Sequence, residues 1–292
     1  MLVELGLVLL AGLKFGAIYA LAALGLVVVH KATKTVNFAH GAFAMLGAFA
    51  SFLIVVHWEW PYWTAYLLIP ITIGAVAALL EFLVLRPLRR ADLFTVVIAT
   101  VFLGIALGEA FRLTYNTELL AVPGMFVGAP FIYWGVIITQ ETLWVITGAL
   151  VAAVACVLLF RYGKLGRGMR AMAASVRGAQ ICGYSVDQVY IIAWCLGGAL
   201  AGLAGVFVAP MAGVSVELSI TIITAGFVAG VLGGFDSLKG AILGGLLLGV
   251  IESLAAAYIS SAMKNCVSFI LLFFVLMWRP EGLFPEKVAR RV

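Results

Sequence analysis

Nine stretches of apolar residues follow one another along the 292-residue chain. A helix rises about 1.5 Å per residue, so about 20 apolar residues cross the roughly 30 Å hydrocarbon core of a bilayer. The stretches lie at residues 5–29, 37–56, 64–85, 93–111, 140–160, 188–209, 221–235, 240–259 and 265–278. This pattern predicts an all-α polytopic membrane protein with about eight or nine transmembrane helices, in a single domain that covers residues 1–292.

The composition argues against a soluble domain. Hydrophobic residues make up 65% of the chain and charged residues 11%, whereas a soluble domain carries about 25% charged residues. The mean hydropathy of +1.19 leaves too little polar surface to cover a water-facing exterior. Basic loops between the apolar stretches account for the net charge of +5, so we expect contact with membrane lipid and no nucleic acid partner.

Basic residues divide sharply between alternate loops. If the chain crosses nine times, fifteen of the eighteen lysines and arginines fall on one side of the membrane. They are Lys31, Lys34, Arg86, Arg89, Arg90, Arg161, Lys164, Arg167, Arg170, Arg177, Lys239, Arg279, Lys287, Arg290 and Arg291. Because cytoplasmic loops carry the excess of basic residues, we expect the N-terminus outside and the C-terminus in the cytoplasm. This requires the stretch 221–235 to cross, although its glycines predict a broken helix.

Polar residues and glycines inside the apolar stretches are the first candidates for a transport pathway. Broken helices at membrane depth line a cavity or are covered by protein, and paired breaks frame the solute path of many transporters. Two such breaks are present; their residues are Asn37, His40 and Gly41 in the first, and Gly233, Gly234 and Asp236 in the second. For Asn37 and His40 the alternative is helix capping and hydrogen bonding near the cytoplasmic surface.

Three ionisable residues lie within the apolar stretches. A charged group in hydrocarbon is costly, so each of them marks either a functional site or a structural pair. Glu252, near the middle of the eighth stretch, is a proton or cation site on the pathway, or a hydrogen-bonding group inside the bundle. Glu81 precedes Arg86 by five residues and reaches toward the inner surface or pairs within the bundle. Lys14 pairs with an acidic group, faces a water-filled vestibule, or lies at the outer interface.

The longest basic loop, residues 161–187, has helix-forming character, with Met172, Val176 and Ala179 on one predicted face. Its composition leaves three interpretations open: the loop docks a motor subunit, it lies on anionic lipid, or it only sets the topology of the chain. The sequence contains no phosphate-binding G-x-x-x-x-G-K-[ST] motif, no metal-ligand cluster and no nucleophile–base arrangement. We therefore expect a transporter rather than an enzyme. It is a subunit driven by a separate ATPase, a stand-alone ion-coupled secondary transporter, or a facilitator channel.

Seven motifs resemble, in order and spacing, the LivH-type permeases of branched-chain amino acid ABC importers. They are Gly16-Ala17-Ile18-Tyr19-Ala20-Leu21, Asn37-Phe38-Ala39-His40-Gly41, Leu85-Arg86-Pro87-Leu88-Arg89, Gly166-Arg167-Gly168-Met169-Arg170-Ala171, Val231-Leu232-Gly233-Gly234, Gly240-Ala241-Ile242-Leu243-Gly244-Gly245 and Arg279-Pro280-Glu281-Gly282-Leu283-Phe284. The Asn-Phe-Ala-His-Gly element is fairly specific to this family. Two departures concern Asp236 and Lys239, which replace Gly and Pro, and Ala173-Ala174-Ser175, which lacks a common acidic residue.

The resemblance implies a permease subunit that forms half of a translocation pathway for branched-chain or other hydrophobic amino acids, or related small solutes, in a bacterial inner membrane. A second related permease, two cytoplasmic ATPase subunits and a periplasmic solute-binding protein would complete the importer. ATP and Mg²⁺ would bind the ATPases, with no cofactor or metal on this chain. The residues expected at the ATPase contact are Arg170, Ala174, Ser175, Arg177 and Gly183. The individual solute, and a homodimer or heterodimer of permeases, stay open.

Overall fold

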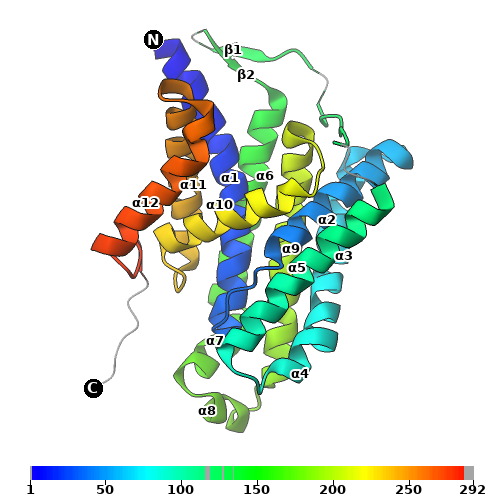
Figure 1. Cartoon of the computed structure of the whole chain (residues 1–292), viewed down its shortest axis with the longest axis vertical. Coiled ribbons are helices and arrows are strands. Elements are labelled where there is room, and N and C mark those ends of the chain that lie inside the picture. Colours follow the sequence, from blue (N-terminus) through cyan, green and yellow to red (C-terminus); the bar gives the residue numbers. More distant parts are fainter. Residues whose placement is uncertain (1, 116–118, 127, 134, 286–292) are drawn as a thin grey trace.

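The computed structural model describes residues 2–115, 119–126, 128–133 and 135–285 as a bundle of helices (Figure 1). The α-helices are α1 (Leu2–Thr33), α2 (His40–Phe52), α3 (Tyr62–Leu80), α4 (Arg86–Leu88), α5 (Leu93–Tyr115), α6 (Gln140–Tyr162), α7 (Lys164–Ala174), α8 (Val176–Ile181), α9 (Val186–Ala212), α10 (Glu217–Gly233), α11 (Leu238–Tyr258) and α12 (Lys264–Trp278). Two π-helical segments, η1 (Leu53–His57) and η2 (Glu81–Leu85), extend α2 and α3, and a 3₁₀ turn, η3 (Ser261–Met263), precedes α12.

Each of the nine predicted apolar stretches is a helix, which confirms the all-α polytopic membrane fold. Within the described residues, seven helices are long and apolar enough to cross a membrane. Their ranges are Val3–Thr33, His40–His57, Tyr62–Leu88, Leu93–Tyr115, Gln140–Tyr162, Val186–Ala212 and Leu238–Tyr258. The other two apolar helices, α10 and α12, are shorter. The described chain therefore contains both full-length and short apolar helices, as the glycine-rich seventh stretch predicts.

A small β-hairpin lies outside the all-α prediction. Strands β1 (Phe131–Tyr133) and β2 (Val136–Ile138) pair antiparallel in the loop between α5 and α6. The hairpin packs on the first turns of α1, since a Cβ at Gly6 would lie 2.9 Å from Val136. Gly135, with φ of +80°, makes the tight turn that places the hairpin there. The apolar loop thus covers the protruding end of α1.

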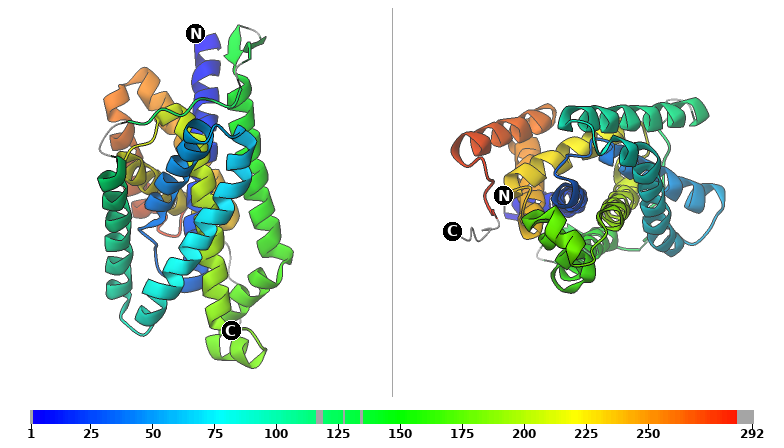
Figure 2. Two further views of the ribbon diagram at one scale, coloured as in Figure 1. Left: turned by 90° about the vertical axis from the view of Figure 1, so that its right-hand side faces the viewer. Right: turned by 90° about the horizontal axis from the view of Figure 1, so that it is seen from below.

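Helix α1 occupies the middle of the bundle and is seen nearly end-on in the right-hand view of Figure 2, which looks at the molecule from below. Its most extensive neighbour is α11, and the two backbones touch because small residues line the contact. A Cβ at Gly249 would lie 2.3 Å from the Gly16 nitrogen, and one at Gly245 would lie 2.4 Å from the Ala20 nitrogen. Without a hydrophobic driving force in lipid, such close backbone packing stabilises helix association.

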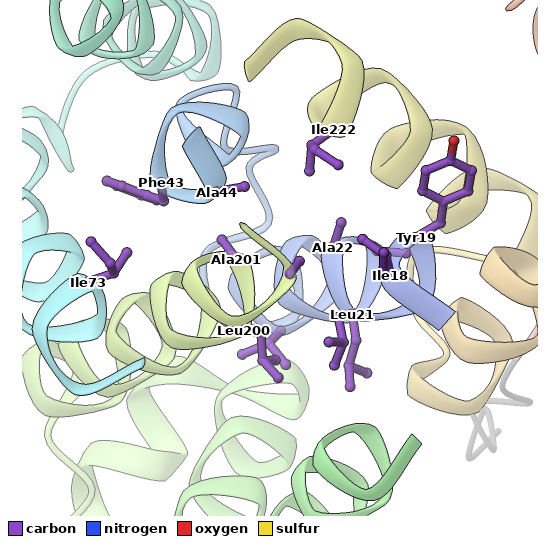
Figure 3. Close-up of a cluster of buried hydrophobic side chains, with 14 of the residues drawn as sticks. Ile18, Tyr19, Leu21, Ala22, Phe43, Ala44, Ile73, Leu200, Ala201 and Ile222 are labelled. Carbon is purple, nitrogen blue, oxygen red and sulfur yellow. The ribbon is translucent and has the colours of Figure 1, made fainter. Parts of the chain in front are cut away.

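Helix α9 forms a second centre of packing, with α2 and α3 against it. Figure 3 shows side chains from α1, α2, α3, α9 and α10 meeting in one cluster; they include Ile18, Leu21, Phe43, Ile73, Leu200 and Ile222. All of these are buried or nearly so. The α1 and α9 backbones approach at Gly25 and Gly197, where a Cβ on Gly25 would lie 3.0 Å from the Gly197 oxygen. This contact joins the two packing centres.

The loops after α1, α4 and α6, which are rich in lysine and arginine, lie toward the lower end of the molecule in Figure 1, and the turn after α10 and the end of α12 lie higher on its left-hand side. We call these loops together the basic end; it comprises the loops after α1, α4, α6, α10 and α12. Lys31 Nζ donates to the Asp236 carbonyl (2.7 Å), and the Leu283 N–H donates to the Leu232 carbonyl (2.8 Å), so three of these loops are in contact. The tail residues Lys287, Arg290 and Arg291 lie outside the described residues. These contacts agree with the predicted grouping of the loops after α1, α10 and α12, and the side of the membrane on which they lie stays a prediction.

Charged residues mark the depth of the membrane along the helices. Asp92 and Arg112 stand 20 positions apart at the two ends of α5, which corresponds to about 30 Å of helix. Lys14 and Lys31 on α1 are 17 positions apart, or about 26 Å. Both distances fit a hydrocarbon core of roughly 30 Å. If Lys31 marks one interface, Lys14 lies near the opposite one, close enough to Glu141 on α6 to interact with its carboxylate, so its place at the outer interface stays a prediction.

Candidate functional site

The chain re-enters the bundle between α1 and α2. Helix α1 ends at Thr33. The His40 ring at the start of α2 nevertheless packs against Gly25, which lies eight positions before that end of α1. A Cβ at Gly25 would lie 2.5 Å from His40 Cε1, so only glycine fits there. Eight residues of helix correspond to about 12 Å. Residues 34–39 thus run back into the membrane, and α2 begins well inside it.

Side chains satisfy the backbone of this re-entrant segment. The Ala39 N–H donates to Asn37 Oδ1 (3.0 Å), and the Phe38 N–H donates to Thr100 Oγ1 on α5 (3.1 Å). Asn37 is 1% exposed and Thr100 is fully buried. Non-helical backbone at membrane depth must find such partners, because no water is available. The Asn37 side chain thus bonds to Ala39, the N-cap residue of α2, which fits the hydrogen-bonding alternative considered for it; α2 itself has no side-chain cap among the described residues.

His40 and Gly41 lie next to Asn37 but face packed protein. His40 is fully buried, and neither of its ring nitrogens has a hydrogen-bond partner among the described residues. Gly41 packs directly on α10, because a Cβ added to Gly41 would lie only 2.0 Å from the Ser219 carbonyl oxygen. The start of α2 is therefore held against both α1 and α10.

The second predicted break is the turn between α10 and α11. Gly233 ends α10 and Gly234 follows with φ of +97°, a conformation that favours glycine. The carboxylate of Asp236 pairs with Lys34 at 3.1 Å, and Ser237 begins α11 by accepting from the Gly240 N–H at 3.0 Å. The turn thus sits at the basic end, tied to the end of α1.

Helix α10, the seventh apolar stretch, is short and tilted. Just before it, Val216 lies 3.4 Å from the Cβ position of Gly108, one turn from Arg112 on α5. After Gly233 the chain leads directly to the basic end. Figure 1 shows α10 steeply tilted relative to α1. Its 17 residues correspond to about 25 Å along the helix axis, less than the roughly 30 Å of the hydrocarbon core, so a full crossing by this stretch stays a prediction.

Glu252 lies apart from both breaks, between α1, α11 and α12. It is 3% exposed. Its Oε2 accepts from the Tyr19 hydroxyl (2.9 Å) and its Oε1 accepts from the Ser268 hydroxyl (2.5 Å). The seven residues predicted for the pathway thus occupy three separate places: the start of α2, the α10–α11 turn and the Glu252 cluster. The contacts of Glu252 fit the structural alternative, a hydrogen-bonded group inside the bundle.

The predicted coupling loop forms two helices, α7 and α8, that project at the basic end (Figures 1 and 2). Ser175 separates them, and its hydroxyl accepts from the Gly178 N–H (3.0 Å) to begin α8. Met172 and Ala179 are buried, as one predicted face requires. Val176 is 48% exposed, so its place on that face is wrong, because the break at Ser175 reorients the chain.

The residues predicted to contact an ATPase divide into two groups. Arg170 turns toward the membrane, where Nη1 donates to the Phe160 carbonyl (2.9 Å) and so caps the end of α6. Arg177 and Ser175 are exposed, and Gly183 is exposed with φ of +83°. Ala174 ends α7, but its side chain lies outside the described part of the structure. We name the exposed group the coupling tip; it comprises Ser175, Val176, Arg177, Gln180, Ile181, Cys182 and Gly183.

The coupling tip has the chemistry of a protein-docking surface. Ile181, the last residue of α8, is 82% exposed, and Arg177 one turn earlier on the same helix is exposed too. Exposed large hydrophobic side chains next to a polar rim mark interaction sites on water-facing surfaces. Arginine is enriched at protein interfaces.

A cluster of charged residues joins the end of α3 to the start of α9. Arg89 bonds to both Glu81 and Asp187, and Arg86 Nη2 donates to Asp187 Oδ2 (2.5 Å). The Arg89 guanidinium also lies 4.6 Å from the centre of the Tyr190 ring. Glu81 thus forms a structural pair, one of the alternatives given for it, and its partner is Arg89. Arg89 and Glu81, eight positions apart, suggest a shared helix face, but nothing in the sequence places Asp187 or Tyr190 beside them.

Comparison with known proteins gives a consistent result. Residues 8–276 match a family described as the permease component of branched-chain amino acid transport systems. The high-affinity branched-chain amino acid transport permease LivH of Salmonella typhimurium is 32% identical over 96% of both chains. BraD of Pseudomonas aeruginosa, described in the same words, is 29% identical over 97% of both chains. A probable LivH of Methanocaldococcus jannaschii is 28% identical over 92% of this chain and 89% of its own. No solved structure matches the chain.

Proposed function

The chain belongs to the family of branched-chain amino acid transport permeases, and from this membership we propose that it is one transmembrane half of an ABC importer for branched-chain or other hydrophobic amino acids. It is a multi-pass membrane protein and a transport subunit rather than an enzyme. The observation that carries the proposal is the match over 96% of both chains to a permease named for this transport. The substrate class follows from the names of the relatives.

The proposed assembly contains a second related permease, two cytoplasmic ATPase subunits and a periplasmic solute-binding protein, in the inner membrane of a bacterium. ATP and Mg²⁺ would bind the ATPase subunits. The coupling tip supports the ATPase contact, because it presents Ile181 and Arg177 to water at the basic end. Basic loops favour the cytoplasmic side of a membrane, which is where ATPase subunits would bind.

The proposed pathway uses the broken helices. The start of α2, with Asn37, His40 and Gly41, packs on α10, and α10 leads to the turn with Gly233, Gly234 and Asp236. A movement of α10 against α2 would open the packed contact and expose these polar groups to the solute. We expect the permease to bind the solute weakly, because conduction needs a site that releases what it binds.

The test is reconstitution of the four kinds of subunit in lipid vesicles with radiolabelled leucine as the probe. We expect uptake that requires ATP, the binding protein and this chain, and no uptake when the ATPase carries a substituted phosphate-loop lysine. Uptake by this chain alone, driven by a proton or sodium gradient, would instead support a secondary transporter that uses Glu252 or His40. Downhill flux that neither ATP nor an ion gradient changes would support a facilitator channel.

A further inference from the structure

Helices α3 and α9 form a tightly packed pair. A Cβ at Gly198 on α9 would lie 2.4 Å from Ala77 and 2.9 Å from the Ile73 carbonyl oxygen. A Cβ at Gly74 on α3 would lie 2.8 Å from the Cys195 carbonyl oxygen. Interiors packed this closely are not continuously deformable, so a displacement of one helix carries the other with it.

The charged cluster of Glu81, Arg86, Arg89 and Asp187 lies at the end of this pair nearest the coupling tip. Asp187 is the second residue of α9, and only Tyr184, Ser185 and Val186 separate it from the tip residue Gly183. Ser185 begins α9 by accepting from the Gln188 N–H (3.4 Å). Asp187 therefore connects the chain leaving the tip to the end of α3.

The environment of Glu81 makes this connection hard to break. Glu81 is 1% exposed, and its Oε2 has no hydrogen-bond partner among the described residues. Arg89 supplies the charge that compensates the buried carboxylate, and the side chain of Arg89 is itself only 18% exposed. Removing one partner of a buried ion pair leaves an uncompensated charge, which is strongly unfavourable. Arg89 thus stays with α3 and holds Asp187 through its other amino group.

We propose that Asp187, Arg86 and Arg89 are positioning residues that transmit movement of the coupling tip into α3. This inference rests on the proposed function, because it needs an ATPase that moves the tip. When the tip moves, Asp187 moves with α9, and the two arginines pull the end of α3 in the same direction. The α3–α9 pair then moves as one body, together with α2, which packs on α9.

Helices α7 and α8 project together at the basic end, and we call them the projection. Its first helix, α7, is held by α6 rather than by the ion cluster. Arg170 on α7 bonds to backbone carbonyls at the end of α6, at Phe160 and Arg161. Helix α6 packs chiefly on α1, and it also contacts α3 and α9: the Tyr66 and Trp144 ring centres lie 5.7 Å apart, and a Cβ at Gly148 would lie 2.8 Å from Phe207. Helices α7 and α8 are therefore anchored at α6 through Arg170 and continue into the start of α9. The ion cluster adds a direct link from the start of α9 to the end of α3.

The experiment uses the complete importer in vesicles and measures leucine taken up per ATP hydrolysed. The variants are Asp187→Asn, which removes the charge that both arginines contact, and Asp187→Glu, which keeps it. We expect Asp187→Asn to lower the ratio by roughly two- to thirtyfold, the range found for residues that couple distant sites. We expect Asp187→Glu to restore most of it. Asp187 is at the surface end of α9, so neither change buries a new group.

Two controls separate this role from a structural one. Arg90→Gln removes a neighbouring exposed charge outside the cluster and should leave the ratio unchanged. Co-purification of the ATPase and the thermal stability of the complex should be equal for Asp187→Asn and the unmodified protein. A normal ratio in Asp187→Asn would overturn the inference, as would a loss of assembly that explains the whole effect. If the unmodified importer shows no ATP-driven uptake, the proposed function itself fails.

Discussion

Two buried carboxylates illustrate how single residues are stabilised inside this bundle. Glu81 is compensated by a cation, Arg89, whereas Glu252 accepts hydroxyl hydrogen bonds from Tyr19 and Ser268. The first arrangement keeps a charge pair at the basic end. The second joins three helices in the half of the membrane farther from it. Because buried polar groups are costly without partners, both clusters fix the helices that carry them.

Removing the Glu252 carboxylate should loosen α12. In Glu252→Ala the hydroxyls of Tyr19 and Ser268 lose this acceptor, and we expect a loss of about 1 to 3 kcal/mol in the free energy of unfolding. Glu252→Gln keeps an acceptor oxygen and should lose less. Unfolding in detergent micelles, followed by circular dichroism, measures both. Ser253→Ala, at the next position, is the matched control. Stability that is unchanged in Glu252→Gln together with abolished uptake would point to an ionic role instead.

The sequence contains less information about residue contacts than about helices. Glu81 is recognisable as an ionisable group in an apolar stretch, but its distant partner Asp187 is 106 positions away in the chain. Arg170 and Arg177 look alike in the sequence, and only the break at Ser175 directs one toward α6 and the other to solvent. Such differences depend on the tertiary arrangement, which no local pattern of residues encodes.

At the scale of elements, apolar length predicted all nine helices but not the depth at which they begin. The second stretch was predicted from residue 37, and α2 begins at His40 after a segment that runs back into the membrane. That depth is set by the fit of His40 against Gly25 and by the bond to Thr100 on α5. The predicted breaks coincide with real ends of helices at the start of α2 and the end of α10.

The two arginines of the projection should differ in their effects. Arg177→Glu changes an exposed residue of the coupling tip, so we expect roughly tenfold weaker ATPase binding, the equivalent of about 1.4 kcal/mol, with normal stability of the permease. Arg170→Glu removes the cap on α6 and should lower the stability by about 1 to 2 kcal/mol as well. Co-purification of the ATPase and thermal unfolding in detergent measure the two effects. Equal loss of stability in both variants would contradict this division.

At the scale of the whole molecule, the basic loops share one end, and the protruding start of α1 and the β-hairpin share the other. The positive-inside rule predicts this end to be cytoplasmic. That prediction needs nine crossings, and α10, which is short and steeply tilted, is the helix on which the count depends.

The native cysteines allow a direct test of the orientation. Cys182 is exposed in the coupling tip, whereas Cys156 is buried. With the chain expressed without ATPases, a membrane-impermeant maleimide should label Cys182 in inside-out vesicles and not in right-side-out spheroplasts. Cys182→Ser gives the background from Cys266, which is exposed on α12 among apolar residues. Labelling of Cys182 from the outside would reverse the proposed orientation.

The re-entrant segment also constrains how the protein is made. The Phe38 N–H donates to Thr100, a residue 62 positions later in the chain. Ribosomes add about 5 to 20 residues per second, so roughly 3 to 12 seconds pass between the synthesis of these two partners. During that interval the first two helices cannot reach their final positions, because the backbone of the segment would enter lipid without this partner. Residues 34–39 must therefore wait at the interface, or in the insertion machinery, until α5 arrives.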